Sequence, residues 1–576
     1  MKRNNEAHFN QVPNLEITRS RFKRDQDIKL TFDAGQLIPF YVDEVLPGDT
    51  FSIDNVGLVR MSTPIFPVMD NCYLDYYYFF CPNRILWEHW KEFMGEVTDE
   101  PWVQQTEYTV PQLKIKGGTE ENKFPMENSI LDYMGIPTKI IGSTTELDVN
   151  ALPIRAYVKI WNEWFRDQNV DNPAINSDKD ADVTYKDSGK DASIETILQE
   201  AYTGGRPLPV NRFHDYFSST LPSPQRSAEN VTIPMLGNAP IYGYKEKELR
   251  TKWKSSTSSL GSEITGQYKT YGSAENGNKV TITSTSINLP KELQFTTDFE
   301  GTDRDFLNKG IAYMGADLSG VTGATINQLR QAFQVQKYFE ELARGGSRYR
   351  EQIYSLFRTR ISDKTVQIPE YLGGDRVMIN MSQVVQTSST TEVSPQGNVS
   401  AMSVTGFGKS AFTKSFEEHG FVIGVCCVRH DHTYQQGLER MFSRKNKLDY
   451  YFPVFANLGE QAVLKKELYA QGNKTDDEAF GYQECWADYR MKPNRICGAF
   501  RSNATGTLDS WHYGDNYNKA PALSQEWMKE GSAEIARTLA VENTVNEPQF
   551  IADFLVKNTT VRPMPMYSVP GLIDHH

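Results

Sequence analysis

Residues 72–94 change from one hydrophobic pattern to another at a single proline. Residues 73–80 are almost continuously aromatic or aliphatic, and only Asp75 breaks the run. Aromatic side chains fit a pleated surface and crowd the turns of a helix, so this run predicts a strand that is buried on both faces. Pro82 is expected to end the strand, because proline cannot donate to a sheet ladder. Beyond it, apolar residues recur at helical spacing and predict a short amphipathic helix over 86–94.

Apolar runs and alternating patterns predict further strands near both ends of the chain. The expected strands lie at 27–33, 37–46, 51–53, 419–432 and 448–455. The first group, together with 73–80, predicts a meander of strands within the first ninety residues.

Helical periodicity is strongest in the middle of the chain. A clear apolar stripe covers 154–165, and a second covers 324–360 with an interruption at Gly345-Gly346, which predicts a helix that stops and restarts. Strands at both ends with helices and loops between them favour a mainly β protein. We therefore predict one sandwich domain over 27–576 that carries large insertions, not a row of domains.

Residues 226–303 form the longest polar stretch, rich in Ser, Thr, Gly, Asn and Lys. A segment this long and this polar is unusual inside a compact domain and predicts a surface protrusion. It nevertheless holds more aromatic residues than a passive linker needs. The aromatic residues expected to pack at the base of the protrusion are Tyr242, Tyr244, Trp253, Tyr268 and Tyr271.

Charge and composition narrow the classes of function. The 576-residue chain has a formal net charge of −12, so contact with nucleic acid is expected to be local. No apolar run is long enough to cross a membrane, and no secretory signal follows the first residues. The six cysteines show neither metal-binding pairs nor the density of a disulfide scaffold, which favours a reducing cytoplasm.

Residues 1–26 are locally basic and contain two aromatic residues. One interpretation is a frayed, solvated terminus. The other is an arm that binds phosphate groups and stacks on unpaired bases. The cations expected to contact nucleic acid are Arg19, Arg21, Lys23 and Arg24.

The candidate catalytic and metal motifs are incomplete. Residues 406–410, GFGKS, lack the first glycine of a phosphate-binding loop and precede a strand instead of a helix. His430 and His432 lie two residues apart, so on a strand both imidazoles share a face and could reach one metal ion. The spacing resembles the first half of a cupin motif, but neither its glutamate nor its second half follows. We favour the interpretation that two polar histidines end a buried strand, and we expect no catalytic site and no cofactor.

Several longer motifs resemble one virus family. They include the run PNRILWEHW at 82–90, YVDEVLPGDTF at 41–51, QKYFEELARGGSRY at 336–349, FTKSFEEHGFVIGV at 412–425, DYYFPVFANLGEQ at 449–461 and YSVPGLIDHH at 567–576. Together they resemble the major capsid protein of gokushoviruses, a branch of the Microviridae, over most of the chain.

The resemblance implies a structural protein of a bacteriophage virion. It implies an eight-stranded antiparallel jelly roll with large helical and loop insertions, assembled as sixty copies in a T=1 icosahedral shell around circular single-stranded DNA. The implied partners are a small basic DNA-binding virion protein, an assembly (scaffolding) protein and a host-cell surface receptor, which the largest insertion would contact. Assembly is expected in the cytoplasm of the bacterial host, without membrane insertion.

Two other classes of function remain open from the residues. A jelly-roll metalloenzyme would use His430 and His432, and metal analysis of the purified chain would detect it. A carbohydrate-binding β-sandwich would behave as a monomer with affinity for glycans.

Overall fold

The computed structural model describes most of the chain. The described residues are 18–97, 106–116, 126–138, 146–227, 325–390, 395–540 and 548–567, together with the backbone of five short strands between 241 and 316. The chain divides into two compact units, one made of Met1–Arg226 with Phe339–His576 and the other of Ser227–Tyr338.

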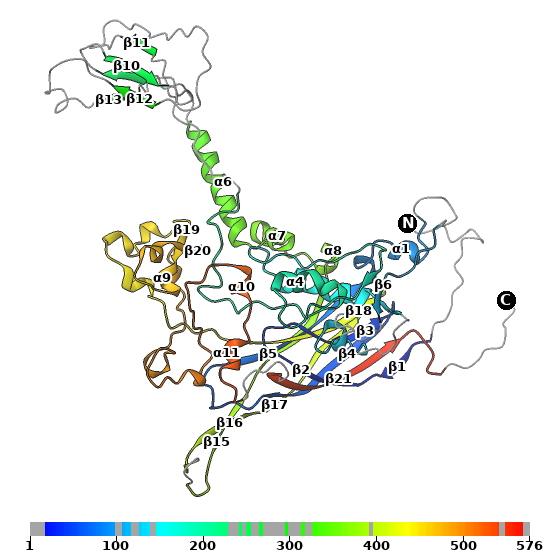
Figure 1. The fold of residues 1–576 in the computed structure, drawn as a ribbon. Helices are drawn as coiled ribbons and strands as arrows, with labels where there is room; N and C mark the ends of the chain where they lie inside the picture. The colour runs from blue at the N-terminus through cyan, green and yellow to red at the C-terminus, as the bar shows by residue number, and fades with distance from the viewer. Residues whose placement is uncertain are drawn as a thin grey trace. The chain divides into compact units, whose positions relative to one another are not determined.

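The first unit is built on two antiparallel sheets that pack face to face (Figure 1). In the first sheet, β1 (Ser20–Lys23) and β2 (Gln26–Phe32) lie end to end along one edge of β21 (Phe550–Arg562), followed by β4 (Thr50–Met61) and β17 (Thr405–Ser415). The second sheet has the order β14 (Glu370–Met378), β5 (Cys72–Pro82), β18 (Gly420–His430) and β3 (Ile38–Val45).

The strand connections confirm the predicted jelly roll. The chain passes from β2 to β3, β4 and β5 by changing sheet at each step, and it does so again from β14 to β17, β18 and β21. Two sheets of four principal strands with this order make an eight-stranded antiparallel sandwich. The predicted meander is therefore wrong, because consecutive N-terminal strands pair in opposite sheets instead of with one another.

Strand β5 is buried on both faces, as its aromatic run predicts. Tyr76 and Tyr78 point into the space between the sheets, where Phe40 and Phe554 stack with ring centroids 4.7 Å apart. Phe79 points the other way, into a second core beneath the helical layer. The opposing sheet covers one face of β5 and the helical layer covers the other.

The long connection between β5 and β14 supplies that helical layer. One of its helices, α3 (Leu152–Ile160), continues into one π-helical turn at Trp161–Phe165, in agreement with the predicted stripe. Over 86–94 the only helix is α1 (Trp90–Phe93), which is shorter than predicted and leaves Phe93 exposed. The other helices of this connection are α2 (Ile130–Tyr133), α4 (Ile194–Glu200), α6 (Ile326–Arg344), α7 (Tyr349–Phe357) and α8 (Asp363–Val366).

The predicted interruption at Gly345-Gly346 falls between α6 and α7. Gly346 has a φ of +94°, a left-handed conformation that glycine adopts without strain. Within the described residues, no helix is both long and apolar enough to span a membrane.

A second long connection joins β18 to β21 and is mostly irregular. Its regular elements are β19 (Glu460–Leu464), β20 (Ala479–Glu484), α9 (Lys465–Leu468), α10 (Gln525–Met528) and α11 (Ala533–Ala536). The strand predicted at 448–455 is wrong, because this stretch forms two 3-10 turns, Lys447–Asp449 and Pro453–Phe455, joined by extended residues. Pro453 cannot donate to a sheet ladder and instead opens the second turn.

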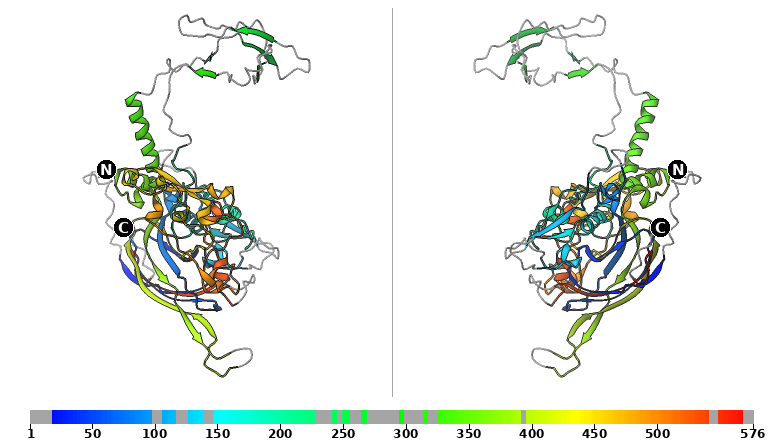
Figure 2. Two further views of the ribbon diagram at one scale, coloured as in Figure 1. Left: turned by 90° about the vertical axis from the view of Figure 1, so that its left-hand side faces the viewer. Right: turned by 90° about the vertical axis from the view of Figure 1, so that its right-hand side faces the viewer.

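Three smaller sheets lie outside the sandwich, and one of them is the antiparallel pair of β19 and β20. A three-stranded sheet combines β6 (Gln112–Lys116), β7 (Glu146–Asn150) and β8 (Val183–Thr184). The hairpin of β15 (Met381–Val385) and β16 (Val399–Ser403) extends away from the sandwich (Figure 2).

The second unit contains two small antiparallel sheets. One pairs β10 (Leu249–Lys254) with β11 (Ile264–Tyr268) and β12 (Gln294–Thr297), and the other pairs β9 (Ile241–Tyr244) with β13 (Tyr313–Ala316). The polar segment 226–303 therefore contributes strands of its own.

Candidate functional site

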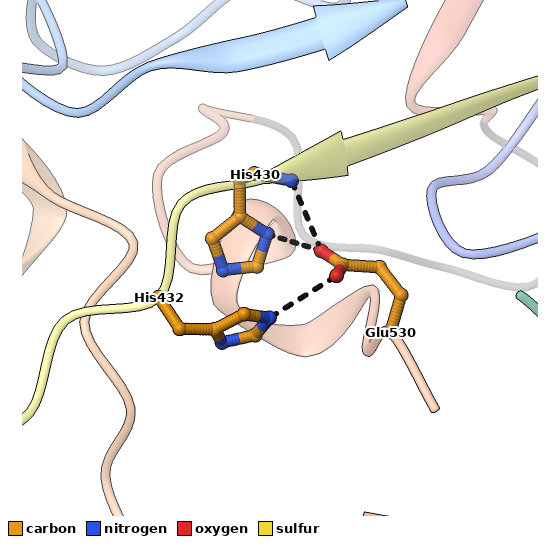
Figure 3. A group of neighbouring side chains, drawn as sticks. All are labelled: His430, His432 and Glu530. Carbon is orange, nitrogen blue, oxygen red and sulfur yellow. Dashed lines mark hydrogen bonds and ion pairs between the residues drawn. The ribbon is translucent and has the colours of Figure 1, made fainter. Parts of the chain in front are cut away.

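The two histidines that the sequence singles out lie at the end of β18. His430 is the last residue of the strand, and His432 follows after one residue. Glu530, just beyond α10, faces both of them (Figure 3). Its backbone N–H donates to the carbonyl of Val210 at 2.9 Å, and its carbonyl packs so tightly against Gly35 that a Cβ there would lie 2.3 Å from it. This contact and the φ of +79° at Gly35 both require glycine, so the backbone fixes where Glu530 can lie.

Glu530 binds both histidines with its two carboxylate oxygens. Oε1 lies 2.5 Å from Nδ1 of His430 and accepts from the backbone N–H of the same residue at 3.2 Å. Oε2 lies 3.1 Å from Nε2 of His432. Figure 3 marks the contacts of Glu530 with both histidines as dashed lines. All three side chains are at most 2% exposed, so the group is closed to solvent.

A second carboxylate completes the network on the far side of His432. Asp515 lies 2.8 Å from Nδ1 of His432 and accepts from Nη1 of Arg212 at 2.5 Å. The Tyr517 hydroxyl donates to the same carboxylate. Four buried ionisable groups therefore follow one another in the order Arg212, Asp515, His432 and Glu530, with His430 at the end.

The pKa values follow from this arrangement. Burial lowers the pKa of His432, but the Asp515 and Glu530 carboxylates outweigh it and raise the pKa to about 10. Burial raises the pKa of Asp515, but Arg212 and His432 hold it well below its usual range. Burial also raises the pKa of Glu530, but His430 and His432 hold it well below its usual range. At neutral pH His432 is consequently a cation between two carboxylates.

The donor types would suit a metal ion, but the geometry favours ion pairs. Ligand atoms of His430, His432 and Glu530 lie within 4.8 Å of one another. Two ligands about 2.0 Å from a tetrahedral metal ion lie roughly 3.3 Å apart, whereas Nδ1 of His430 and Oε1 of Glu530 are 2.5 Å apart. The charges of Arg212, Asp515, His432 and Glu530 also cancel without any added cation. The cluster therefore fastens the chain near residues 515 and 530 to the end of β18, a buried strand that ends at His430 as the sequence predicts. That no metal binds here stays a prediction.

Sequence patterns do not reveal the acidic partners of this cluster. Asp515 and Glu530 lie 83 and 98 residues beyond His432, and Arg212 lies 220 residues before it. No local motif connects positions so far apart. Only the topology, which returns the chain to the end of β18 from both long connections, brings them together.

The basic residues near the N-terminus belong to an edge of the first sheet. Arg21 and Lys23 lie on β1, paired with Val561 and Thr559, and both side chains are exposed. Arg19 precedes the strand and is also exposed. Alternation along a strand places residues two apart on one face, so these three cations share the solvent side.

Arg24 has a different environment from the other three cations. Its Nη1 and Nη2 donate to the two carboxylate oxygens of Asp43 at 2.7 and 2.6 Å. Asp43 is itself buried and also accepts from the Tyr41 hydroxyl and from Nδ2 of Asn558. Arg24 thus neutralises a buried carboxylate. Residues 1–17 lie outside the described residues.

The aromatic residues predicted at the base of the protrusion fall mainly on strands of the second unit. Tyr242 and Tyr244 lie on β9, opposite Gly315 and Tyr313 of β13. Trp253 and Tyr268 lie on β10 and β11, and Trp253 is also opposite Phe295 of β12. Tyr271 lies outside the described residues. The role of these residues in a surface protrusion stays a prediction.

Comparison with known proteins identifies the family. The model of the capsid protein (F protein) family matches residues 10–572. The capsid protein VP1 of Chlamydia phage 1 is 39% identical over 98% of the chain and 97% of its own length. The VP1 capsid proteins of Bdellovibrio phage phiMH2K and Spiroplasma virus 4 are 39% and 35% identical, each over at least 97% of both chains. These matches confirm the resemblance to gokushovirus capsid proteins, and the chain belongs to the capsid protein (F protein) family as a structural protein of phage virions, not an enzyme.

Proposed function

We propose that the chain assembles as sixty copies into a T=1 icosahedral shell around circular single-stranded DNA. The observation that carries the proposal is the complete eight-stranded jelly roll, interrupted by two long connections, in a chain that matches the capsid family over nearly its whole length. Closed symmetry lets one kind of subunit enclose a volume through repeated contacts. The irregular connections supply surface beyond the sandwich from which such contacts can be built.

The copy number is tested by the mass of purified particles. Sixty chains of 65.6 kDa would total about 3.9 MDa of protein. The chain should be produced together with its phage partners, and particles should be examined by electron microscopy and native mass spectrometry. Subunits that stay monomeric under these conditions, or particles of a different protein mass, would contradict the proposal. The same mass spectra would reveal the small basic virion protein and the scaffolding protein that we expect as partners.

We further propose that Arg19, Arg21, Lys23 and Arg24 mark a basic surface on the DNA side of the shell. Support comes from the shared solvent face of the first three, since exposed cations in a row can follow a phosphate backbone. Lys23 also lies 3.2 Å from Asp25, an exposed contact that a phosphate group could replace. Arg24 already binds Asp43, so its contribution to DNA binding should be the smallest of the four.

Replacing Arg19, Arg21 and Lys23 with Gln should leave the shell intact and release DNA at lower salt than the parent. Each phosphate contact to a single strand contributes a slope of about −0.7 in log affinity against log salt, so losing three contacts should flatten the slope by about 2. Arg24→Gln serves as the comparison and should affect folding more than salt dependence. If the DNA content and the salt slope are unchanged in the triple variant, these residues do not bind DNA and are only a solvated edge of the sheet.

The polar segment 226–303 is proposed to form the protrusion that attaches the virion to a host receptor. Its composition supports exposure, and recognition residues often lie on loops held by a rigid scaffold. Its aromatic residues would pack between neighbouring copies at the base. Shortening 255–263, which lies between β10 and β11 in the sequence, should give particles that keep their DNA and lose adsorption to host cells. The matched control shortens the turn between β15 and β16, which should spare adsorption. Normal adsorption by the first variant would remove the receptor role, and failed assembly would show that the segment joins subunits instead.

A further inference from the structure

The connection between β18 and β21 exposes a concentration of large apolar side chains. Six of them are between 50% and 88% exposed: Phe442, Leu448, Tyr450, Val454, Leu458 and Tyr489. Residues 441–458 include no buried position at all. All six lie on the connection between β18 and β21, and we use GH surface only as a name for these six side chains. Large exposed apolar areas on a soluble protein usually mark an interaction site.

Polar contacts within the chain hold this stretch in place. Oδ2 of Asp449 accepts from the backbone N–H groups of Lys445 and Asn446, at 2.7 Å each. Nε of Arg444 donates to the carbonyl of Asp449 at 2.9 Å, while its guanidinium pairs with Asp488. These contacts fix the first turn of the stretch without burying its apolar side chains.

The second turn is fastened to the residues around Trp486. Nε1 of Trp486 donates to the carbonyl of Phe455 at 3.0 Å, and its ring contacts Tyr451 with centroids 5.7 Å apart. The Arg444 guanidinium lies 4.4 Å from the ring centroid of Tyr489. An apolar surface that is already ordered binds with a smaller loss of conformational entropy than a mobile loop does.

The composition of this region favours a protein over a nucleic acid as the occupant, because the six exposed apolar side chains outnumber the two exposed lysines of 441–458, Lys445 and Lys447. Its arginines are already paired, Arg444 with Asp488, Arg440 with Glu467 and Arg495 with Glu439. Binding of a phosphate backbone depends on cations that are free to replace counterions. Covering six large apolar side chains that are at least half exposed would be a strong driving force for protein association.

We propose that the GH surface is a contact between neighbouring copies of this chain in the capsid. The proposal rests on the proposed function, because a shell requires every subunit to bury surface against other copies. The hydrophobic pattern of 448–455 supports the same conclusion, since it predicts an aromatic strand whereas the single chain leaves most of the stretch exposed. A second copy would supply the burial that the pattern calls for and the single chain lacks. Aromatic residues and Met are enriched in such interface cores, and Lys and Glu are depleted.

The first test introduces a charge into the GH surface. Phe442→Asp with Val454→Asp should give a subunit that folds, by thermal melting and limited proteolysis, but forms at least tenfold fewer particles in sucrose gradients. Met69→Asp is the matched control, because Met69 is 69% exposed and lies outside the GH surface. Particle yields equal to those of the parent would overturn the proposal. If the parent itself forms no particles, the proposed function fails instead, so the two failures are distinguishable.

A second test stays informative if the charged variant does not fold. Val454→Cys, in a Cys497→Ser background that removes the exposed native thiol, places one accessible thiol on the GH surface while the other cysteines are buried. The thiol should react with maleimide in the free subunit and be protected at least tenfold in particles. Equal reactivity in both states would refute a contact there. Protection that is lost when particles are made without another phage protein would assign the surface to that protein instead.

Discussion

The sequence Leu-Asp-Tyr-Tyr occurs at 74–77 and again at 448–451, and the two copies have opposite environments. In β5, Leu74, Asp75 and Tyr76 have no exposed surface. In the second copy, Leu448 is 68% exposed and the stretch starts in a 3-10 turn. The first copy pairs with β14 on one side and β18 on the other, whereas the second pairs with no strand among the described residues.

The difference shows how little four residues decide by themselves. Asp75 forms ion pairs with two guanidinium groups, those of Arg376 and Arg429, which lie on the strands on either side of it. Asp449 receives only the backbone N–H groups three and four residues before it and closes a turn. A run of aromatic residues fits a sheet only where neighbouring strands offer both hydrogen bonds and packing partners. Where the chain itself supplies neither, the same residues become a surface for another molecule.

Removing the buried carboxylate should produce the largest effect. Asp75→Asn leaves the side-chain shape intact but strands Arg429, whose side chain is only 14% exposed, without its anion. Breaking a buried pair by removing one partner costs about 3–5 kcal/mol. Urea denaturation of unassembled subunits would measure this loss. Asp449→Asn, the same change in the exposed copy, should lower the free energy of unfolding far less. Equal losses in the two variants would show that the paired arginines are not what distinguishes the sites.

Adding a methyl group to the packed interior next to β5 should have the next largest effect on stability. Gly424 of β18 faces Tyr78, and a Cβ there would lie 2.9 Å from a ring carbon of Tyr78 and 3.0 Å from Phe40. Gly424→Ala should therefore cost about 1–3 kcal/mol of stability. Phe442→Ala, on the GH surface, should change the stability of the unassembled subunit by no more than about 0.5 kcal/mol. A large loss in the second variant would mean that the exposed stretch packs on its own chain.

The pH dependence of stability should report on the buried cluster of His432, Asp515 and Glu530. The raised pKa of His432 contributes stability that is complete below its ordinary value of 6.5 and is lost as the pH rises toward about 10. The lowered pKa values of Asp515 and Glu530 contribute stability that is present above their ordinary range near 4 and lost in acid. The urea midpoint should therefore fall between pH 6.5 and 10, and His432→Gln should remove most of that fall. An alkaline limb that survives this change would assign the effect to other groups.

The sequence predicted those parts of the fold that depend on local pattern. The aromatic run of β5, the buried strand β18 and the break between α6 and α7 each carry their signal within about a dozen residues. Strand pairing was not predictable in this way, because the local patterns of β2, β3, β4 and β5 indicate strands but not which of the two sheets each strand joins. The jelly roll itself followed from the family resemblance.

The candidate site was predictable only in part, for the same reason. The strand pattern placed His430 and His432 together, but their charges are balanced by residues from distant connections. The strand predicted at 448–455 failed because hydrophobicity reports that a residue will be buried, not which chain will bury it. A subunit that assembles can bury apolar residues against another copy instead of within its own chain.

The smallest effect should come from loosening the exposed stretch at 448–451 without changing its apolar side chains. Hydrogen bonds from the backbone N–H groups of Asn446 and Lys445 lower the pKa of Asp449, so the turn is held best above its ordinary pKa of 3.8 and is released as the pH falls below it. Asp449→Ala should remove that restraint at every pH. Hydrogen exchange should speed up at residues 445 and 446 while the global unfolding transition stays where it is. Particle yield should fall a fewfold, because a mobile GH surface must be ordered when copies meet. The Phe442→Asp and Val454→Asp variant should still fall much further, since it removes the apolar contact itself. If Asp449→Ala speeds exchange without lowering particle yield, order in this turn contributes nothing to assembly.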